Sequence, residues 1–203
     1  DEVCVTNINR QLHALSDTVG RPKVDVMAGR IRAIHPGCAV EAVTDFFTAE
    51  TADAILAPPL DAVADAIDDA RLKALLIARC RSAGLPVVVS GGAGGRRDPL
   101  RLRAADLAFS SHDPLLAEVR RRLRRDHGFP PPGQPFGVDC VFSEEPPVFP
   151  ASDGETCARP EPGSEVRLDC RTGLGTAAFV TGAFGLAVAA RVIHRLVETP
   201  GTT

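Results

Sequence analysis

The sequence predicts an α/β fold with a mostly parallel sheet and flanking helices. Two short apolar runs, 62–67 and 85–89, have the length of buried strands, and a helical pattern lies between them at 70–83. This order of strand, helix and strand is typical of a parallel sheet. The 203 residues suit one good-sized domain with a substantial core.

The first expected helix begins at Pro22 and ends before Pro36, because apolar residues recur between them at spacings near 3.6. A brief helix is expected at 51–56. The run at 62–67 ends in acids, and Gly84 stops the helix at 70–83. These elements make up the first part of the predicted domain.

The second part differs in character. Alternation at 100–104 predicts a half-exposed strand, and Asp113 is positioned to cap a helix that reaches Gly128. The proline-rich stretch 129–162 contains one expected strand, 138–142, and is otherwise predicted to be a long loop on or across the sheet.

Nineteen uncharged residues lie between Arg171 and Arg191, so a membrane-spanning helix has to be considered. The segment holds four Gly, three Thr and six Ala, which makes it less apolar than a spanning helix. We therefore expect no membrane span and predict a buried helix that packs closely inside the domain.

Charge and cysteine content narrow the functional classes. The 23 Lys and Arg nearly balance the 26 Asp and Glu, which excludes a globally basic nucleic-acid binder. Any contact with nucleic acid must be local, and an arginine cluster at 120–125 offers either such a contact or a solvated helix face. The six cysteines form no C-x-x-C pair, which excludes a zinc ribbon and favours reduced thiols in the cytoplasm. Cys140, Cys157 and Cys170 have no adjacent base that would make them nucleophiles.

Two polar segments are candidates for a nucleotide site. Asp1 and the stretch 7–11 precede Lys23, a cation at a helix start where the helix dipole does not favour it. An acid for ribose hydroxyls and cations for phosphates would suit a nucleoside triphosphate, and a solvated turn with a surface lysine is the alternative. The acids of segment 65–69 follow a buried strand, where one could hold Mg²⁺ and Asp68 or Asp69 could instead cap a helix.

The glycine-rich segment 91–95 also follows a strand, but it is a weak signal for phosphate binding. No Lys-Ser or Lys-Thr follows it, as a phosphate-binding loop of the P-loop type requires. Close backbone approach to a ligand and a tight structural turn both remain open.

Several of these segments together resemble the adenylation core of the ThiF/MoeB, or ubiquitin-activating-enzyme-like, superfamily. They are Asp1, 7–11, 19–23 and 65–68. Four further segments resemble its tRNA threonylcarbamoyladenosine dehydratase subfamily: 4–7, 91–95 with Asp98-Pro99, 137–143 and 169–170. The resemblance covers almost the whole chain and implies a Rossmann-like sheet, with 1–95 as the nucleotide-binding part and 96–203 as the C-terminal part of one adenylation domain.

The resemblance also implies an activity. The family uses ATP to activate the carboxylate of threonylcarbamoyladenosine in tRNA, and the side chain then cyclises with loss of water. Asp1 would hold ribose, Arg10 and Lys23 would clamp the triphosphate, and Asp68 would bind Mg²⁺. Asn7 and Gln11 would belong to the same ATP site. Arg121, Arg124 and Arg125 are then the candidate tRNA contacts, and a homodimer and a sulfur-transfer protein are expected partners.

The sequence departs from the superfamily in two ways. The first strand and the glycine-rich phosphate loop of the superfamily should precede Asp1, so we expect part of a longer enzyme that is inactive or impaired alone. The zinc-binding cysteine pairs of the sulfur-carrier activators are absent, which favours the tRNA branch. Adenylation of a ubiquitin-like sulfur carrier and a non-catalytic scaffold remain the alternative functions.

Overall fold

A four-stranded sheet forms the centre of the protein. The computed structural model describes residues 1–151, 153–159 and 175–197. The strand order is β1 (Val63–Asp65), β2 (Val87–Ser90), β4 (Asp139–Ser143) and β3 (Leu102–Asp106). β1 pairs with β2 and β2 with β4 in parallel, whereas β3 is antiparallel to β4. The predicted α/β fold with a mostly parallel sheet is therefore confirmed.

The register of the sheet sets where a ligand can bind. Asp65, the last residue of β1, lies opposite Val89, and Ser90, the last residue of β2, lies opposite Val141. The carboxyl ends of β1 and β2 therefore reach the same edge of the sheet. In open parallel sheets this edge is where ligands bind.

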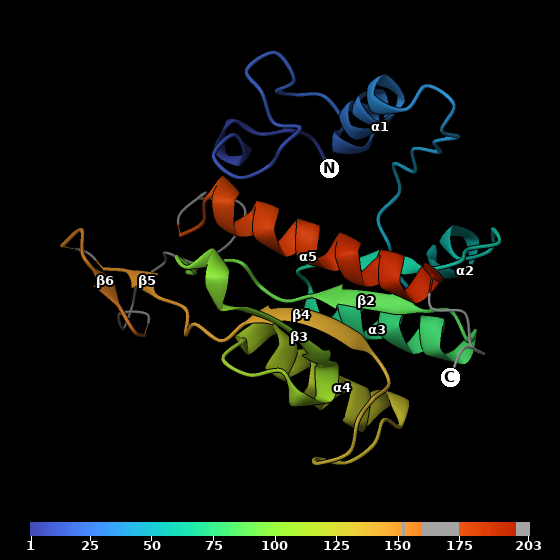
Figure 1. Ribbon diagram of the computed structural model, residues 1–203, viewed down its shortest axis with the longest axis vertical. Helices are drawn as coiled ribbons and strands as arrows, with labels where there is room; N and C mark the ends of the chain where they lie inside the picture. Colours follow the sequence, from blue (N-terminus) through green and yellow to red (C-terminus); the bar gives the residue numbers. More distant parts are fainter. Residues whose placement is uncertain (152, 160–174, 198–203) are drawn as a thin grey trace.

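Helices α3 (Ala70–Ser82) and α4 (Pro114–His127) cover one face of the sheet, and α5 (Ala178–Val197) covers the other (Figure 1). The caps that the sequence predicts are present. The Asp113 carboxylate accepts from the Leu116 amide and caps α4, which ends at Gly128 with a left-handed φ of 64°. Asp69, one of the two caps proposed from sequence, accepts from the Arg71 and Leu72 amides at the start of α3.

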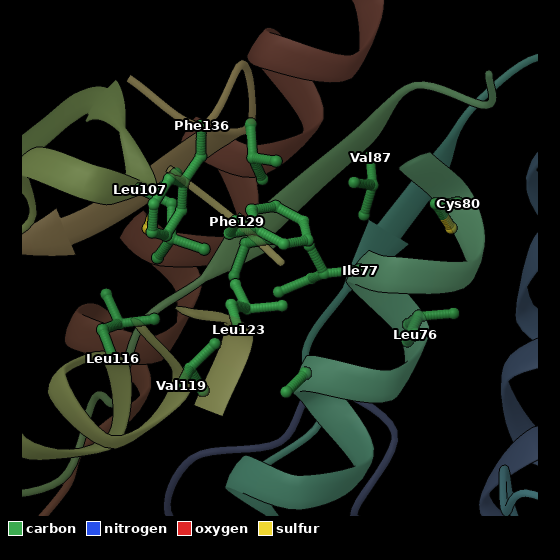
Figure 2. Close-up of a cluster of buried hydrophobic side chains, with 14 of the residues drawn as sticks. Leu76, Ile77, Cys80, Val87, Leu107, Leu116, Val119, Leu123, Phe129 and Phe136 are labelled. Carbon is green, nitrogen blue, oxygen red and sulfur yellow. The ribbon is translucent and has the colours of Figure 1, made fainter. Parts of the chain in front are cut away.

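The main core lies between the sheet and the α3–α4 pair (Figure 2). Ile77 from α3 and Leu116, Val119 and Leu123 from α4 are fully buried. Phe129 and Phe136, from the proline-rich stretch, meet edge to face with ring centroids 5.1 Å apart. The loop predicted at 129–162 therefore begins as part of the core. It also contains a hairpin of β5 (Phe149–Pro150) and β6 (Thr156–Cys157), whose strands are too short to leave a periodic pattern in the sequence.

The prediction of a buried, closely packed helix holds for only one stripe of α5. Only Val180, Phe184 and Val188 are buried, and Leu186 is 76% exposed. Cβ atoms added at Gly182 and Gly185 would meet nothing within 4 Å, so these glycines mediate no close contact. The reason is geometric, because a sheet face contacts only one stripe of a helix that lies on it.

By length and hydropathy α5 also meets the criteria for a membrane-spanning helix, and it is the one helix in the described part of the chain that does so. In the structure it lies along the sheet. Arg191 and Arg195 near its end donate to the Asp139 carboxylate of β4, at 3.0 and 2.7 Å.

The first part of the N-terminal segment, with η1 (Val5–Asn7) and α1 (Lys23–Ile34), lies on the side of α5 that faces away from the sheet (Figure 1). α2 (Ala52–Ile55) lies beside α3 instead, where Arg79 of α3 pairs with Asp53 at 2.8 Å. α1 and α2 agree with the helices expected from Pro22 and at 51–56. Two further short 3₁₀ turns, η2 (Pro99–Arg101) and η3 (Leu107–Phe109), flank β3.

Candidate functional site

A cavity of about 540 Å³ opens at the carboxyl ends of β1 and β2. Five parts of the chain form most of its wall: Arg10 and Gln11, segment 66–68 after β1, segment 90–94 after β2, the start of α4 at 113–115, and Thr181 of α5. The volume falls within the range of about 300–1,000 Å³ that is typical of small-molecule sites. Of the residues proposed from sequence, Arg10, Gln11 and Asp68 are therefore brought together.

Local backbone contacts fix the positions of Arg10 and Gln11. The Asn7 side chain accepts from the Cys4 amide at 3.0 Å, and the Asn7 carbonyl accepts from the amides of Arg10 and Gln11 at 3.0 and 2.9 Å. The Thr181 hydroxyl donates to the Arg10 carbonyl at 2.7 Å and so joins this turn to α5. Asn7 thus shapes the turn that carries Arg10, and the structure places it there rather than among the residues that line the cavity.

The Arg10 guanidinium lies in a polar setting although the residue is only 7% exposed. Its Nη1 donates to Asn9 Oδ1 at 3.0 Å and to the Thr6 carbonyl. A guanidinium held in this way against a cavity wall has little freedom to lose on binding an anion.

Asp68 is exposed in the turn between β1 and α3, and it lines the cavity. Since Asp69 caps α3, Asp68 is not used as a helix cap. Within the described residues no three His, Cys, Asp or Glu side chains cluster as a metal site would require. A single carboxylate fits Mg²⁺, which typically takes one or two protein carboxylates and completes its shell with water and phosphate oxygens.

Asp1 and Lys23 pair with each other, and neither is among the residues that line the cavity. Lys23 Nζ lies 2.5 Å from Asp1 Oδ2, and the Asp1 side chain is 60% exposed. The anionic neighbour that the position of Lys23 suggested is thus Asp1 itself. Of the six candidate residues, Arg10, Gln11 and Asp68 line the cavity, Asp1 and Lys23 pair at the start of α1, and Asn7 supports the turn that carries Arg10.

Glycine is required at position 91 because the start of α4 lies against the backbone at this position. A Cβ atom there would lie 2.5 Å from Asp113 Oδ2 and 3.1 Å from Leu116 Cδ1. The Gly92 amide donates to the same Asp113 oxygen at 2.8 Å. The glycine-rich segment is therefore a tight structural contact and also a wall of the cavity, which joins the two interpretations left open by the sequence.

Sequence reasoning missed Arg96, which lines the cavity and is 3% exposed. Its Nη2 donates to the His112 carbonyl at 2.6 Å, whereas Nε and Nη1 have no hydrogen-bond partner in the described part of the chain. Burial lowers the pKa of Arg96, against the opposing effect of Asp113 and Glu145. Gln11 Oε1 and Thr176 Oγ1, on the same cavity wall, are likewise buried without a partner. Such unpaired groups are costly, and a polar ligand would satisfy them.

Lys73 was also missed. It is fully buried and its Nζ lies 3.0 Å from Asp65 Oδ1. Burial raises the pKa of Asp65, and Lys73 opposes the rise. The sequence contained a signal for this residue, because Lys73 occupies the buried face of α3 with Leu76, Ile77 and Cys80, where an unpaired charge would not be tolerated.

None of the five cysteines in the described ranges lines the cavity. Cys140 is fully buried in β4, and burial raises the pKa of its thiol. Cys157 donates its thiol to the Arg159 carbonyl at 2.8 Å, and Cys170 lies outside the described residues.

The arginine cluster of α4 is mostly engaged within the helix. Arg121 pairs with Glu118 and Arg125 with Asp126, at 2.7 and 2.6 Å, and both arginines remain exposed. Arg124 is held differently, because it donates to the Pro130 carbonyl and stacks 4.8 Å from the Phe136 ring centroid. Of the three candidate tRNA contacts, Arg121 and Arg125 are thus the accessible ones.

Comparison with known proteins matches the sequence and the fold to one family. The sequence profile of the ThiF family matches residues 1–203. The tRNA threonylcarbamoyladenosine dehydratase of Escherichia coli (strain K12) is 45% identical over 199 residues, which are 97% of this chain and 74% of the relative. The enzyme of the same name from Bacillus subtilis (strain 168) is 36% identical and is covered to 75%.

Solved structures agree. The crystal structure of the E. coli dehydratase in complex with ATP superposes with a TM-score of 0.82 at 41% identity, covering 97% of this chain and 72% of that one. Its complex with AMP gives the same TM-score at 42% identity and the same coverage. The resemblance noted from the motifs is confirmed, and the chain belongs to the ThiF family and, within it, to the tRNA threonylcarbamoyladenosine dehydratases.

Proposed function

We propose that this protein catalyses the ATP-dependent cyclisation of threonylcarbamoyladenosine in tRNA by activating the carboxylate of the threonyl side chain. The observation that carries the proposal is the grouping of Arg10, Gln11 and Asp68 around one cavity at the carboxyl ends of parallel strands. Relatives that bear the dehydratase name, and their complexes with ATP and AMP, support it.

The proposed chemistry has two steps. A carboxylate oxygen bonds to the α-phosphorus of ATP and pyrophosphate leaves. Ring closure of the side chain then displaces AMP, which carries away the oxygen that would otherwise leave as water. A carboxylate is a poor electrophile until this exchange, so the protein mainly has to position the two reactants and neutralise charge.

Arg10 is the residue we assign to charge stabilisation on the phosphates. It lines the cavity, and its backbone is fixed by Asn7 and Thr181. Asp68 would hold Mg²⁺, which when bound with the triphosphate supplies further positive charge at the phosphate oxygens. Gln11 would hydrogen-bond the nucleotide through the amide oxygen that is buried without a partner in the described part of the chain.

For Lys23 to bind phosphate and Asp1 to bind ribose, as we propose, the ion pair between them must break. Ion pairs that are open to solvent contribute only about 0–1 kcal/mol, and this one is open on the Asp1 side although the Lys23 side chain is 19% exposed, so a triphosphate can compete for the lysine. Asp1 would then be available to a ribose hydroxyl. The 60% exposure of the Asp1 side chain supports this exchange.

The compartment and assembly are further proposals. Five described cysteines are free thiols, which supports the cytoplasm. Exposed apolar residues of α5, such as Leu186 and Ile193, support a homodimer.

The experiment that tests the function is nucleoside analysis of tRNA from a strain that lacks the gene. We expect the cyclic nucleoside to be lost and to return when the complete gene is restored. In the purified enzyme, Arg10→Ala should lower the rate by about 10² to 10³, as does removal of one charge-stabilising donor elsewhere.

Arg30→Ala on the exposed side of α1 is the matched control and should leave the rate unchanged. A deletion strain with normal tRNA and a requirement for a sulfur-containing cofactor would favour activation of a sulfur carrier instead. A loss of tenfold or less in Arg10→Ala would remove the role proposed for that residue.

For tRNA, we expect Arg121→Gln with Arg125→Gln to weaken binding and to flatten its dependence on salt, while ATP affinity stays the same. Filter binding at several salt concentrations measures this. Unchanged tRNA affinity would assign these arginines to a solvated helix face.

A further inference from the structure

Lys73 makes an unusual set of contacts for a lysine. It lies on α3 with 0% of its side chain exposed, and lysine is almost never fully buried unless it is paired. Its Nζ contacts Asp65 Oδ1 at 3.0 Å, the Ile67 carbonyl at 2.9 Å and the Asp65 carbonyl at 3.5 Å. All three oxygens belong to the turn between β1 and α3.

Asp68, which lines the cavity, belongs to the same turn. On one side, the Ile67 amide donates to Asp65 Oδ1 at 2.9 Å while Lys73 holds the Ile67 carbonyl. On the other side, Asp69 is fixed as the cap of α3 through the amides of Arg71 and Leu72. Asp68 is thus the residue between two anchored points.

A buried ion pair of this kind is a poor source of stability. Removing two charges from water costs about as much as their attraction returns, and apolar replacements of such pairs are often neutral or stabilising. Asp65 Oδ2 is also buried without a hydrogen-bond partner in the described part of the chain. What the ammonium ion provides is a single point that binds a carboxylate and a carbonyl together, and so fixes the shape of the turn.

We infer that Lys73 is a positioning residue for the nucleotide site: its ammonium ion holds the 65–67 turn and thereby sets the place from which the Asp68 carboxylate reaches the metal-bound triphosphate. The inference rests on the proposed function. A displacement of about 1 Å in a positioned group can lower a rate by about 10²-fold, so a loosened turn should have a measurable effect.

The test uses the full-length enzyme and two substitutions. In Asp65→Asn with Lys73→Met, both charges are removed together, so that no unpaired buried charge remains. We expect the thermal midpoint to change little. We also expect the Mg²⁺ concentration needed for half-maximal ATP binding, measured by calorimetry, to rise about tenfold or more, with faster hydrogen exchange at the Ile67 amide. Lys73→Arg keeps a buried cation beside Asp65, so it should need a Mg²⁺ concentration close to that of the wild type for half-maximal ATP binding.

Arg71→Met is the control, because Arg71 is an exposed cation on the same helix and should leave the Mg²⁺ response unchanged. If the double variant does not fold, Lys73→Met alone carries the test, because it removes the ammonium ion, and the Asp65 carboxyl, whose pKa is raised by burial, can take up a proton. A rise of about threefold or more in the Mg²⁺ requirement then supports the inference. A folded variant with the wild-type Mg²⁺ requirement would overturn the inference and leave the proposed function intact. Wild-type protein that binds no ATP at any Mg²⁺ concentration would overturn both.

Discussion

The two faces of the sheet differ in how completely they are covered. Among the residues that the structure describes, fifteen buried ones form one continuous core on the α3–α4 side, whereas the α5 side has a cluster of five. Leu123 on α4 is fully buried, and Leu186 on α5 is 76% exposed. The first face therefore provides most of the apolar burial, which is the main source of stability.

The less covered face contributes to the site. Thr181, in the first turns of α5, holds the Arg10 carbonyl, and both residues line the cavity. The densely packed face contributes the start of α4, whose Asp113 fixes the glycine-rich segment. The cavity therefore lies where a densely packed layer meets a layer with a smaller buried cluster.

The largest effect that would test this comparison is expected for leucine truncation on the two faces. Leu123→Ala should lower the free energy of unfolding by about 2–5 kcal/mol, because it leaves a cavity in a core that cannot collapse around it. Leu186→Ala, the matched change on α5, should alter the free energy of unfolding of the monomer by no more than about 0.5 kcal/mol, whereas burial of Leu186 in the proposed homodimer would make the loss larger. Urea denaturation measures both, and equal losses would show that α5 is covered in solution.

A smaller difference is expected for matched valines. Val119 and Val180 are 0% and 1% exposed, so each Val→Ala change removes a similar apolar area. That area alone corresponds to about 1.6 kcal/mol. The cavity left in the tightly packed core should raise the loss of unfolding free energy for Val119→Ala to about 2–3 kcal/mol. Around Val180 the surroundings can relax, so the cavity should add little to the loss for Val180→Ala. A larger loss of stability from Val180→Ala than from Val119→Ala would contradict the tighter packing of the α3–α4 face.

The smallest effect concerns the ion pairs that fasten α5 to β4. Partial burial acts to raise the pKa of Asp139, but hydrogen bonds from Arg195 and Arg191 outweigh it and hold the pKa below its ordinary value. The carboxylate therefore stabilises the fold above the ordinary aspartate pKa of about 3.9, and the contribution is lost as pH falls through the lower, folded-state pKa.

Asp139→Asn should accordingly lower the free energy of unfolding at neutral pH by about 1 kcal/mol, since the two arginines are partly exposed and the pairs are screened. Urea denaturation of both proteins at neutral and acid pH measures the difference, which should shrink as Asp139 becomes protonated. A difference that grows in acid would mean that the carboxylate is not the group responsible.

Much of the fold could be predicted because its signals are local. Asp113 and Gly128 mark the ends of α4 through contacts with residues in the same turn. For the site, the resemblance to the superfamily predicted that Arg10, Gln11 and Asp68 share one ATP site, whereas residue types and spacing alone left this open. The hairpin β5–β6 and the roles of Arg96 and Lys73 depend on contacts that no periodic pattern records.

The sequence by itself determined the order of the sheet strands and the main helices along the chain, the helix caps and the residue types of the site, because propensity, capping and periodicity act within a few residues. Only the tertiary structure decided that α5 is buried along one stripe, that Lys73 reaches the turn below Asp68, and that Thr181 meets Arg10 across 171 positions of the chain. These contacts depend on which face of the sheet each helix covers, which is settled by packing the whole molecule.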